Sequence, residues 1–186
     1  MNSKDTHWPI FDYPDIHSHI EGEGRVLSVD FTAIPSGFVP SGPFTLGIHP
    51  WHADSDIDWN KFEEMLRLPA IVGIGEAGLD SIKGPSMDIQ LPVFEKQIEL
   101  ADKYNLPLVI HSVRNNHVIL KLKKELKPHV PWIIHGFRGN TEAARQLIDA
   151  GIHLSLGKRS GIGDVTALNR DFIHYETDEI QDNKNI

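Results

Sequence analysis

The chain has 186 residues, and its 18 Lys and Arg against 26 Asp and Glu give a net charge of −8 when the histidines are neutral. A length near the ~150 residues of a common domain predicts one domain over residues 1–186. The acidic charge excludes nucleic-acid binding by bulk positive charge, and the lack of cysteine excludes disulfides and thiolate metal ligands. No apolar run approaches the ~18 residues of a membrane span, and the N-terminus lacks a signal pattern, so we expect a cytoplasmic protein with no membrane attachment.

Short apolar runs rich in Val, Ile and Phe alternate with amphipathic stretches, a pattern typical of α/β proteins. Eight runs are predicted to be strands: 11–19, 26–31, 44–49, 71–76, 108–111, 132–135, 153–156 and 172–178. Helical spacing and end signals predict helices between the later strands, over 58–68, 88–104, 116–126 and 141–150, with a short helical turn over 164–169.

Eight strands with helices between most of them predict a parallel (β/α)8 barrel of the TIM type. The barrel is expected to be reduced and distorted, because 186 residues are fewer than the ~250 that such barrels usually take. The early helices are predicted to be missing, since residues 19–44 show no helical pattern, and the final helix too, since eight residues follow Asp178. A doubly wound open sheet is the alternative.

Six histidines and carboxylates lie where predicted strands end, the edge at which barrel enzymes place their catalytic groups. They are His17, His19, Glu76, His111, His135 and Asp178. Because His17 and His19 are two residues apart, strand alternation aims both imidazoles the same way. Imidazoles and carboxylates are metal ligands, and six of them exceed the three or four that one tetrahedral ion needs. The set predicts two divalent ions about 3.5–4 Å apart, with Glu76 near the middle as the bridge.

Other residues near the same edge are secondary candidates. His49 either donates a hydrogen bond to a substrate oxygen, braces a metal ligand or simply packs a loop. Three cations follow later strands and either bind phosphate oxygens or are solvated surface charges: Arg114, Arg138 and Lys158. Glu176 is predicted to face into the barrel, and Asp80 is interpreted as a structural turn residue.

Motifs at these positions resemble the TatD-related family of metal-dependent hydrolases, and the similarity covers nearly the whole chain. The matching stretches are DIHSH (15–19), GIHPW (47–51), GIGEAGLD (73–80), the spaced Gln, Phe and Gln of 90–101 that lead into LPLVIH (106–111), IIHGFRGN (133–140) and ETD (176–178). Motif by motif, the family's metal ligands fall on the six residues given above. The family is similar to the amidohydrolase superfamily, so the resemblance also implies a distorted barrel.

The ligand set and the resemblance together predict a hydrolase in which two ions of Zn²⁺, Mn²⁺ or Mg²⁺ activate a shared water as hydroxide. Asp178 is predicted to orient the hydroxide and to take its proton. The resemblance implies phosphodiester hydrolysis, with DNA cleaved from an end, and Arg114 and Arg138 would hold one terminal phosphate. Three alternatives are a small-molecule amidohydrolase or lactonase, a small-molecule phosphoesterase, and a metal-binding protein without turnover.

The last predicted strand leads to an expectation about partners. If Asp178 faces the barrel interior, alternation turns Ile173 and Tyr175 outward, beside Ile16 of the first strand. An apolar seam of this kind should not remain in water. We therefore expect either a homodimer through the seam near Ile16, Ile173 and Tyr175, or a natural chain that continues past Ile186.

Overall fold

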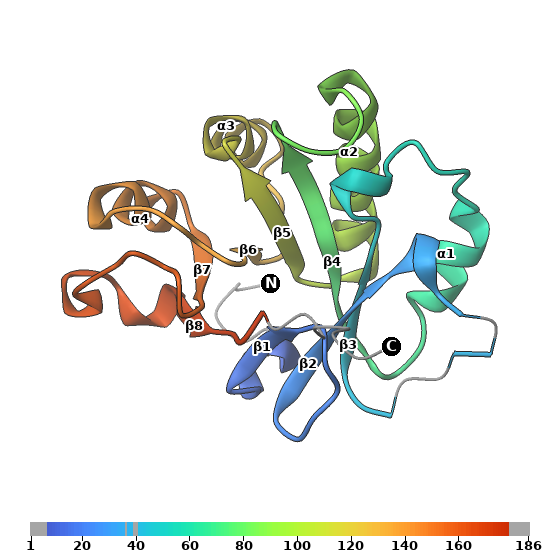
Figure 1. Cartoon of the computed structure of the whole chain (residues 1–186), viewed down its shortest axis with the longest axis horizontal. Helices are drawn as coiled ribbons and strands as arrows, with labels where there is room; N and C mark the ends of the chain where they lie inside the picture. The colour runs from blue at the N-terminus through green and yellow to red at the C-terminus, as the bar shows by residue number, and fades with distance from the viewer. Residues whose placement is uncertain (1–6, 36, 39–40, 179–186) are drawn as a thin grey trace, which may run out of the picture.

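The computed structural model describes residues 7–35, 37–38 and 41–178, which form one sheet of eight parallel strands. Each strand pairs with its neighbours in the chain, so the sheet runs from β1 to β8 without a change of direction (Figure 1). The strands are β1 (Asp15–Ser18), β2 (Arg25–Asp30), β3 (Phe44–Gly47), β4 (Ile71–Asp80), β5 (Leu108–Val113), β6 (Trp132–Ile134), β7 (Ile152–Leu156) and β8 (Ile173–Tyr175). This order is that of a barrel and excludes the doubly wound sheet, whose strand order reverses in the middle.

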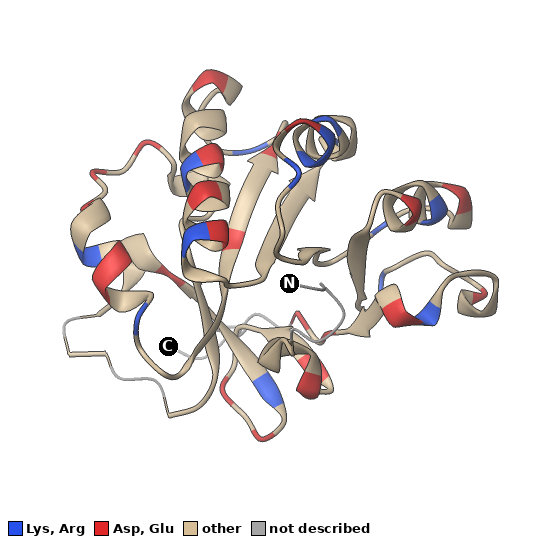
Figure 2. Cartoon of the chain, turned by 180° about the vertical axis from the view of Figure 1, so that it is seen from behind, with Lys and Arg blue, Asp and Glu red and all other residues tan. Residues whose placement is uncertain are grey.

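Four α-helices cover the outside of the later strands (Figure 1). They are α1 (Trp59–Met65), α2 (Met87–Tyr104), α3 (Asn116–Leu126) and α4 (Thr141–Asp149). Each begins and ends close to its predicted bounds, because capping residues and prolines mark the ends; Asn140, for example, accepts a hydrogen bond from Ala143 N at the start of α4. Charged residues lie mostly on the helices and loops (Figure 2). The predicted turn over 164–169 is a 3-10 helix, η4 (Val165–Ala167).

The early part of the barrel has no α-helix among its described residues, as predicted. The described residues between β2 and β3 contain one 3-10 turn, η2 (Phe31–Ala33). The predicted absence of a final helix concerns residues 179–186, which lie outside the described residues. No helix of the described chain is long and apolar enough to cross a membrane.

Two apolar layers form the core. The inner layer fills the barrel with one side chain from each of several strands, and the 3-10 helix η1 (Pro9–Asp12) adds Ile10 to it. The outer layer joins the strands to the helices and includes Phe94 and Trp132. The prediction that residues 11–19 form one strand is wrong at its start, because η1 opens with Pro9, whose fixed φ suits the first turn of a helix.

The strand β4 is longer than predicted and passes Glu76 to end at Asp80. Its backbone lies unusually close to β5. A Cβ added to Gly78, whose φ is +145°, would lie 2.0 Å from the carbonyl oxygen of His111. Only glycine fits such an approach, and it brings the C-terminal part of β4 next to the middle of β5. Glu76 therefore lies within a continuous strand and not at its end.

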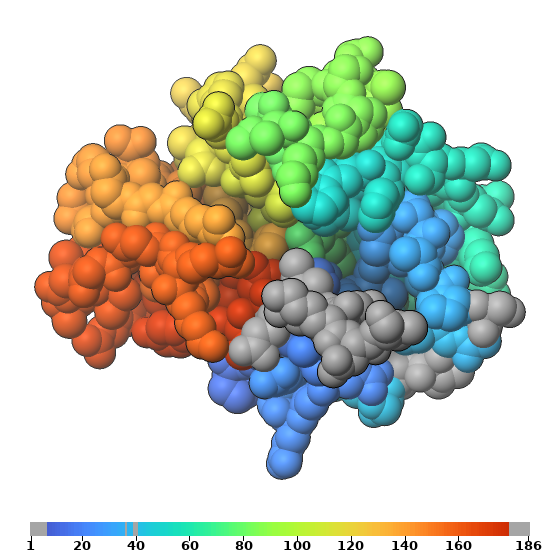
Figure 3. Space-filling model, viewed as in Figure 1, coloured from blue at the N-terminus to red at the C-terminus, as the bar shows by residue number. Residues whose placement is uncertain are grey.

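The predicted seam between the first and last strands is wrong for Ile16. This residue is 1% exposed and belongs to the inner layer, because a register shift between Asp15 and Ser18 breaks the alternation of β1. Ile173 is half-buried against the outer layer, while Tyr175 is 57% exposed. The first and last parts of the described chain lie side by side (Figure 3). A dimer through the remaining exposed part, around Tyr175, stays a prediction.

Candidate metal centre

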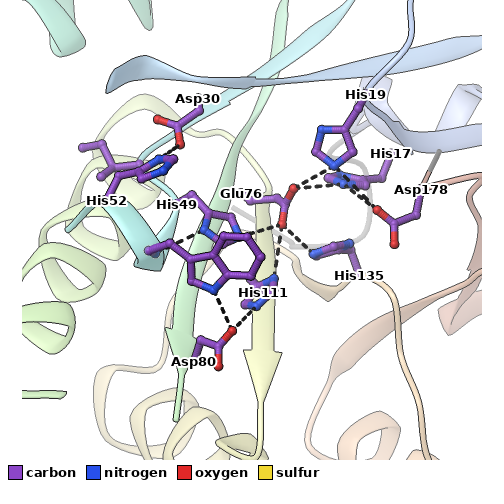
Figure 4. Close-up of polar contacts among 12 residues, drawn as sticks. His17, His19, Asp30, His49, His52, Glu76, Asp80, His111, His135 and Asp178 are labelled. Carbon is purple, nitrogen blue, oxygen red and sulfur yellow. Dashed lines mark hydrogen bonds and ion pairs between the residues drawn. The ribbon is translucent and has the colours of Figure 1, made fainter. Parts of the chain in front are cut away.

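One oxygen of the buried Glu76 carboxylate faces His17 of β1 and His19, which follows that strand. His17 Nε2 and His19 Nε2 each lie 3.2 Å from Glu76 Oε1 (Figure 4). The same two nitrogens lie 3.9 and 3.6 Å from Asp178 Oδ1, which follows β8. The first and last segments of the barrel and the middle of β4 therefore meet at one point.

The other oxygen of Glu76 faces His49 and His135, which follow β3 and β6, and His111, which lies within β5 and not at its predicted end. His135 Nε2 lies 2.9 Å from Glu76 Oε2, and His111 Nδ1 and His49 Nε2 each lie 3.3 Å from it. The five other residues of the predicted set are thus brought together around Glu76, with His49 as an additional neighbour. The carboxylate divides them, since the two oxygens face different groups of imidazoles.

Asp15, to which the sequence analysis gave no role, holds Asp178 near the first strand. It accepts hydrogen bonds from Thr177 N at 3.1 Å and from Thr177 Oγ1 at 2.8 Å. Asp178 N donates in turn to the carbonyl of His17 at 3.3 Å. These bonds join the chain after β8 to β1. Asp178 has a left-handed backbone with φ +46°, a conformation that aspartate tolerates better than most residues.

Asp80 fixes the ring of His111. Its Oδ2 lies 3.2 Å from His111 Nε2 and accepts a 2.7 Å bond from Trp51 Nε1. A proton on Nε2 would be directed at Asp80 and would leave the lone pair of His111 Nδ1 facing Glu76, an arrangement common for metal-binding histidines. Asp80 also accepts hydrogen bonds from Ile82 N and Lys83 N. It therefore has the predicted turn role and, in addition, holds His111.

Glu176 stands behind His135 in a similar way. Its side chain is fully buried, and its Oε1 lies 3.8 Å from His135 Nδ1. This distance is longer than a hydrogen bond, and within the described part of the chain both Glu176 oxygens lack a hydrogen-bond partner. The inward orientation predicted for Glu176 is what the structure has.

His49 points at Glu76 and not into open space. Its Nδ1 accepts a hydrogen bond from Trp51 N at 3.2 Å, so Nε2 carries the proton and is the nitrogen that faces Glu76. Gln97 fixes the loop by bonding both Ile48 N and Ile48 O. Of the options that the sequence left open for His49, this geometry favours bracing a ligand over contact with substrate.

The charges of the site oppose the effect of burial. Burial raises the pKa of the Glu76 carboxyl, but the charges of His135 and His17 outweigh it and hold that pKa well below its usual range. Hydrogen bonds to Asp178 and then Glu76 raise the pKa of His19 to about 9. Burial lowers the pKa of His49. The carboxylates are therefore ionised and able to attract cations.

The donor set fits bound divalent cations. An ionised carboxylate offers about four lone-pair sites, which is fewer than the five imidazole nitrogens that lie around Glu76. His17 is completely buried, and neither of its ring nitrogens has a hydrogen-bond partner among the described residues, because Nε2 is near Glu76 without being aligned for a bond. Potential ligand atoms within 4.8 Å of one another form three groups: His17, His19 and Glu76; His17, His135 and Asp178; and His49, Glu76 and His111. A buried imidazole with no hydrogen-bond partner costs free energy, and a bound cation would supply the missing partner.

A cleft of about 670 Å³ opens above this centre. Arg138 lies on its edge, as does Arg159, which the sequence analysis overlooked. Arg159 Nη2 is 3.9 Å from Asp178 Oδ2. Arg114 lines a neighbouring cavity of about 290 Å³ that also reaches His111 and Asp178. Lys158 lines a third cavity with both Arg138 and Arg159.

A second polar pair on the cleft wall could not be predicted from the sequence. His52 Nδ1 lies 2.5 Å from Asp30 Oδ2 (Figure 4), and Asp30 Oδ1 is held by the backbone and hydroxyl of Thr32. The two residues are 22 positions apart, and neither belongs to a motif. Only the packing of the loop after β3 against the end of β2 brings them together.

The chain is similar to known metal-dependent hydrolases. The family model described as TatD related DNase matches residues 39–180. The chain is 39% identical to a metal-dependent hydrolase, YabD, of Bacillus subtilis, over 60% of this chain and 46% of that protein. It is 28% identical to the 3'-5' ssDNA/RNA exonuclease TatD of Edwardsiella piscicida, over 60% of this chain and 45% of that protein. The chain therefore spans about half the length of these curated relatives.

A solved structure supports the fold. The crystal structure of YjjV, a TatD homologue of Escherichia coli, superposes with a TM-score of 0.65 at 23% identity, covering 91% of this chain and 80% of that one. The expected resemblance is confirmed by a family model that spans most of the chain and by this architecture. The chain belongs to the TatD-related DNase family.

Proposed function

We propose that this protein is a divalent-metal-dependent phosphodiesterase of the deoxyribonuclease type that acts at the ends of DNA. The observation that carries the proposal is the position of Glu76, whose two oxygens face two different groups of imidazoles. A carboxylate placed in this way can join two ions, and two adjacent ions suit the attacking and leaving oxygens of a phosphodiester.

The residues that would hold the ions divide along this carboxylate. His17 and His19 lie at Oε1, and His111 and His135 lie at Oε2. Divalent ions bound there would lower the pKa of a water and withdraw charge from the phosphate. Imidazole-rich ligation favours Zn²⁺, while Mn²⁺ and Mg²⁺ are also compatible with a nitrogen and oxygen set.

Asp178 has the position of a general base. It borders the main cleft and both smaller cavities beside it, whereas Glu76 is almost completely buried. Burial raises the pKa of Asp178, but the bond to His19 and the charge of His135 outweigh it and keep the carboxylate ionised. An ionised carboxylate facing solvent can orient the attacking water and accept its proton.

Substrate charge would be met locally, because the chain as a whole is acidic. Arg138 and Arg159 lie on the cleft edge near Asp178, where guanidinium groups can bind phosphate oxygens in pairs. His49 would keep Glu76 in place through its Nε2 proton. An interaction confined to a few cations suits a strand end better than a long duplex.

The test is hydrolysis by the metal-loaded chain of end-labelled single-stranded DNA, a cyclic amide, a lactone and a phosphomonoester. The proposal expects release of nucleotides from the DNA that EDTA abolishes and divalent ions restore. Its matched control is Glu76→Ala, which should be inactive on every substrate. Turnover of the amide or lactone with none of the DNA would assign the site to an amidohydrolase, and retained metal without any turnover would indicate a binding protein.

A further inference from the structure

The cleft above Glu76 has an apolar wall for which the hydrolytic chemistry gives no reason. Trp51 is 39% exposed and lines this cleft together with Ile82, which is 59% exposed, and Val113. Large apolar side chains exposed beside a polar site are a common mark of ligand contact.

The Trp51 ring is held in place. Its Nε1 donates to Asp80 Oδ2 at 2.7 Å, and its backbone N donates to His49 Nδ1 at 3.2 Å. Gly84 packs closely against the Trp51 backbone, since a Cβ on Gly84 would lie 2.8 Å from Trp51 Cα. A fixed indole offers a flat binding face at little cost in conformational entropy.

The indole lies within one nucleotide of the metal centre. Its ring centroid is 4.7 Å from that of His49 and 6.1 Å from that of His111, and both imidazoles approach Glu76 to 3.3 Å. Lys83 Nζ lies 4.5 Å from the indole centroid, as expected for a face that attracts cations. Lys83 is exposed, so its side chain can make room for a planar ring.

We infer that Trp51, with Ile82 and Val113, is a stacking subsite for the nucleobase of the nucleotide whose phosphodiester is hydrolysed at the metal centre. The inference rests on the proposed function and adds to it the side of Glu76 on which the nucleobase binds. Asp178 lies on the other side of Glu76 from Asp80, which holds Trp51 (Figure 4), and Arg159 Nη2 lies 3.9 Å from Asp178 Oδ2. The base therefore occupies the Trp51 side and the adjoining phosphate the arginine side. Stacking accepts any base, so the subsite selects nucleotides without reading sequence.

The test compares two variants that both remove the Trp51 hydrogen bond to Asp80. Trp51→Phe keeps an aromatic face, whereas Trp51→Leu does not. Calorimetry would measure the dissociation constants of thymidine 5′-monophosphate and of 2-deoxyribose 5-phosphate, which lacks the base. We expect the wild type to prefer the nucleotide by about tenfold, a common size for stacking. Trp51→Phe should keep most of that preference, and Trp51→Leu should bind the two compounds about equally.

The control is Trp59→Leu on α1, since Trp59 packs against Phe62 and does not line the cleft. It should keep the wild-type preference. Equal binding of the two compounds by the wild type, or an equal preference in Trp51→Phe and Trp51→Leu, would overturn the base subsite. A wild type that cleaves DNA but lacks the preference would refute this inference alone. One that has the preference but cleaves no phosphodiester would refute the proposed function and still support the subsite.

Discussion

His135 Nε2 lies 2.9 Å from Glu76 Oε2, the shortest of the contacts between this carboxylate and imidazoles in the described chain. The pair joins the middle of β4 to the residue that follows β6. Because both side chains are buried, neither can exchange its partner for water.

Asp178→Asn should keep bound metal and lose most of its activity. Asparagine has the same shape, and it tolerates the left-handed backbone at φ +46°, so the fold should be unaffected. It cannot take a proton from water, and we expect kcat on DNA to fall by about 10²–10⁴-fold. Metal analysis and steady-state kinetics would be compared with Asp164→Asn, an exposed helix cap. Activity near that of the wild type would show that Asp178 is not the base.

Asp80→Asn should weaken metal binding without touching a ligand. The substitution removes the negative charge that holds His111 Nε2 at 3.2 Å, so the imidazole loses its fixed orientation. Loss of such a partner typically reduces metal affinity by about 10–100-fold. Competition with a chelating dye would measure this change, with Trp51→Phe as the control that removes only the indole bond. An unchanged affinity would mean that Asp80 serves the turn alone.

Arg138 should matter more for substrate binding than Arg114. Arg138 borders the main cleft, whereas Arg114 lines only a neighbouring cavity. Arg138→Gln is expected to raise KM for DNA by about tenfold, the effect of losing a charged hydrogen bond, while Arg114→Gln should raise it less than threefold. Metal content should be the same in both. If neither variant changed KM, both arginines would be solvated surface charges.

Acid should destabilise the fold through a half-buried histidine pair. His153 Nδ1 lies 2.9 Å from His174 Nε2, and both rings stack on Phe11. Burial lowers the pKa of His153 to about 3 and that of His174 to about 4. Above these pKa values both imidazoles stay neutral in the folded chain. In the unfolded chain the same imidazoles take up protons below their ordinary pKa of 6.5. The free energy of unfolding should therefore fall as pH drops from 6.5 towards 4, by up to about 1.4 kcal/mol per unit for each histidine.

Urea unfolding in EDTA at several pH values would measure this slope. The double variant His153→Gln and His174→Gln should have a shallower slope than the wild type, while His117→Gln, at an exposed position, should match the wild type. Equal slopes in all three proteins would exclude the pair as a source of acid sensitivity.

The positions of the six central residues could be predicted because each lies at or close to the end of an apolar run, although β4 and β5 continue beyond Glu76 and His111. The partners of those residues could not be predicted in the same way. Asp80 reaches His111 because β4 continues past Glu76, and this depends on the close approach of Gly78 to β5. The inward position of Ile16 depends on a register shift in β1 that no local pattern marks. Such features arise from contacts between strands and not from the periodicity of any one of them.

Metal stoichiometry is the most direct test of the central claim, that Glu76 joins two ions held by the histidines around it. Elemental analysis of the wild type after reconstitution and removal of free metal should give two divalent ions per chain, and Glu76→Ala should give fewer than one. One ion or fewer in the wild type, or two retained in Glu76→Ala, would contradict the account.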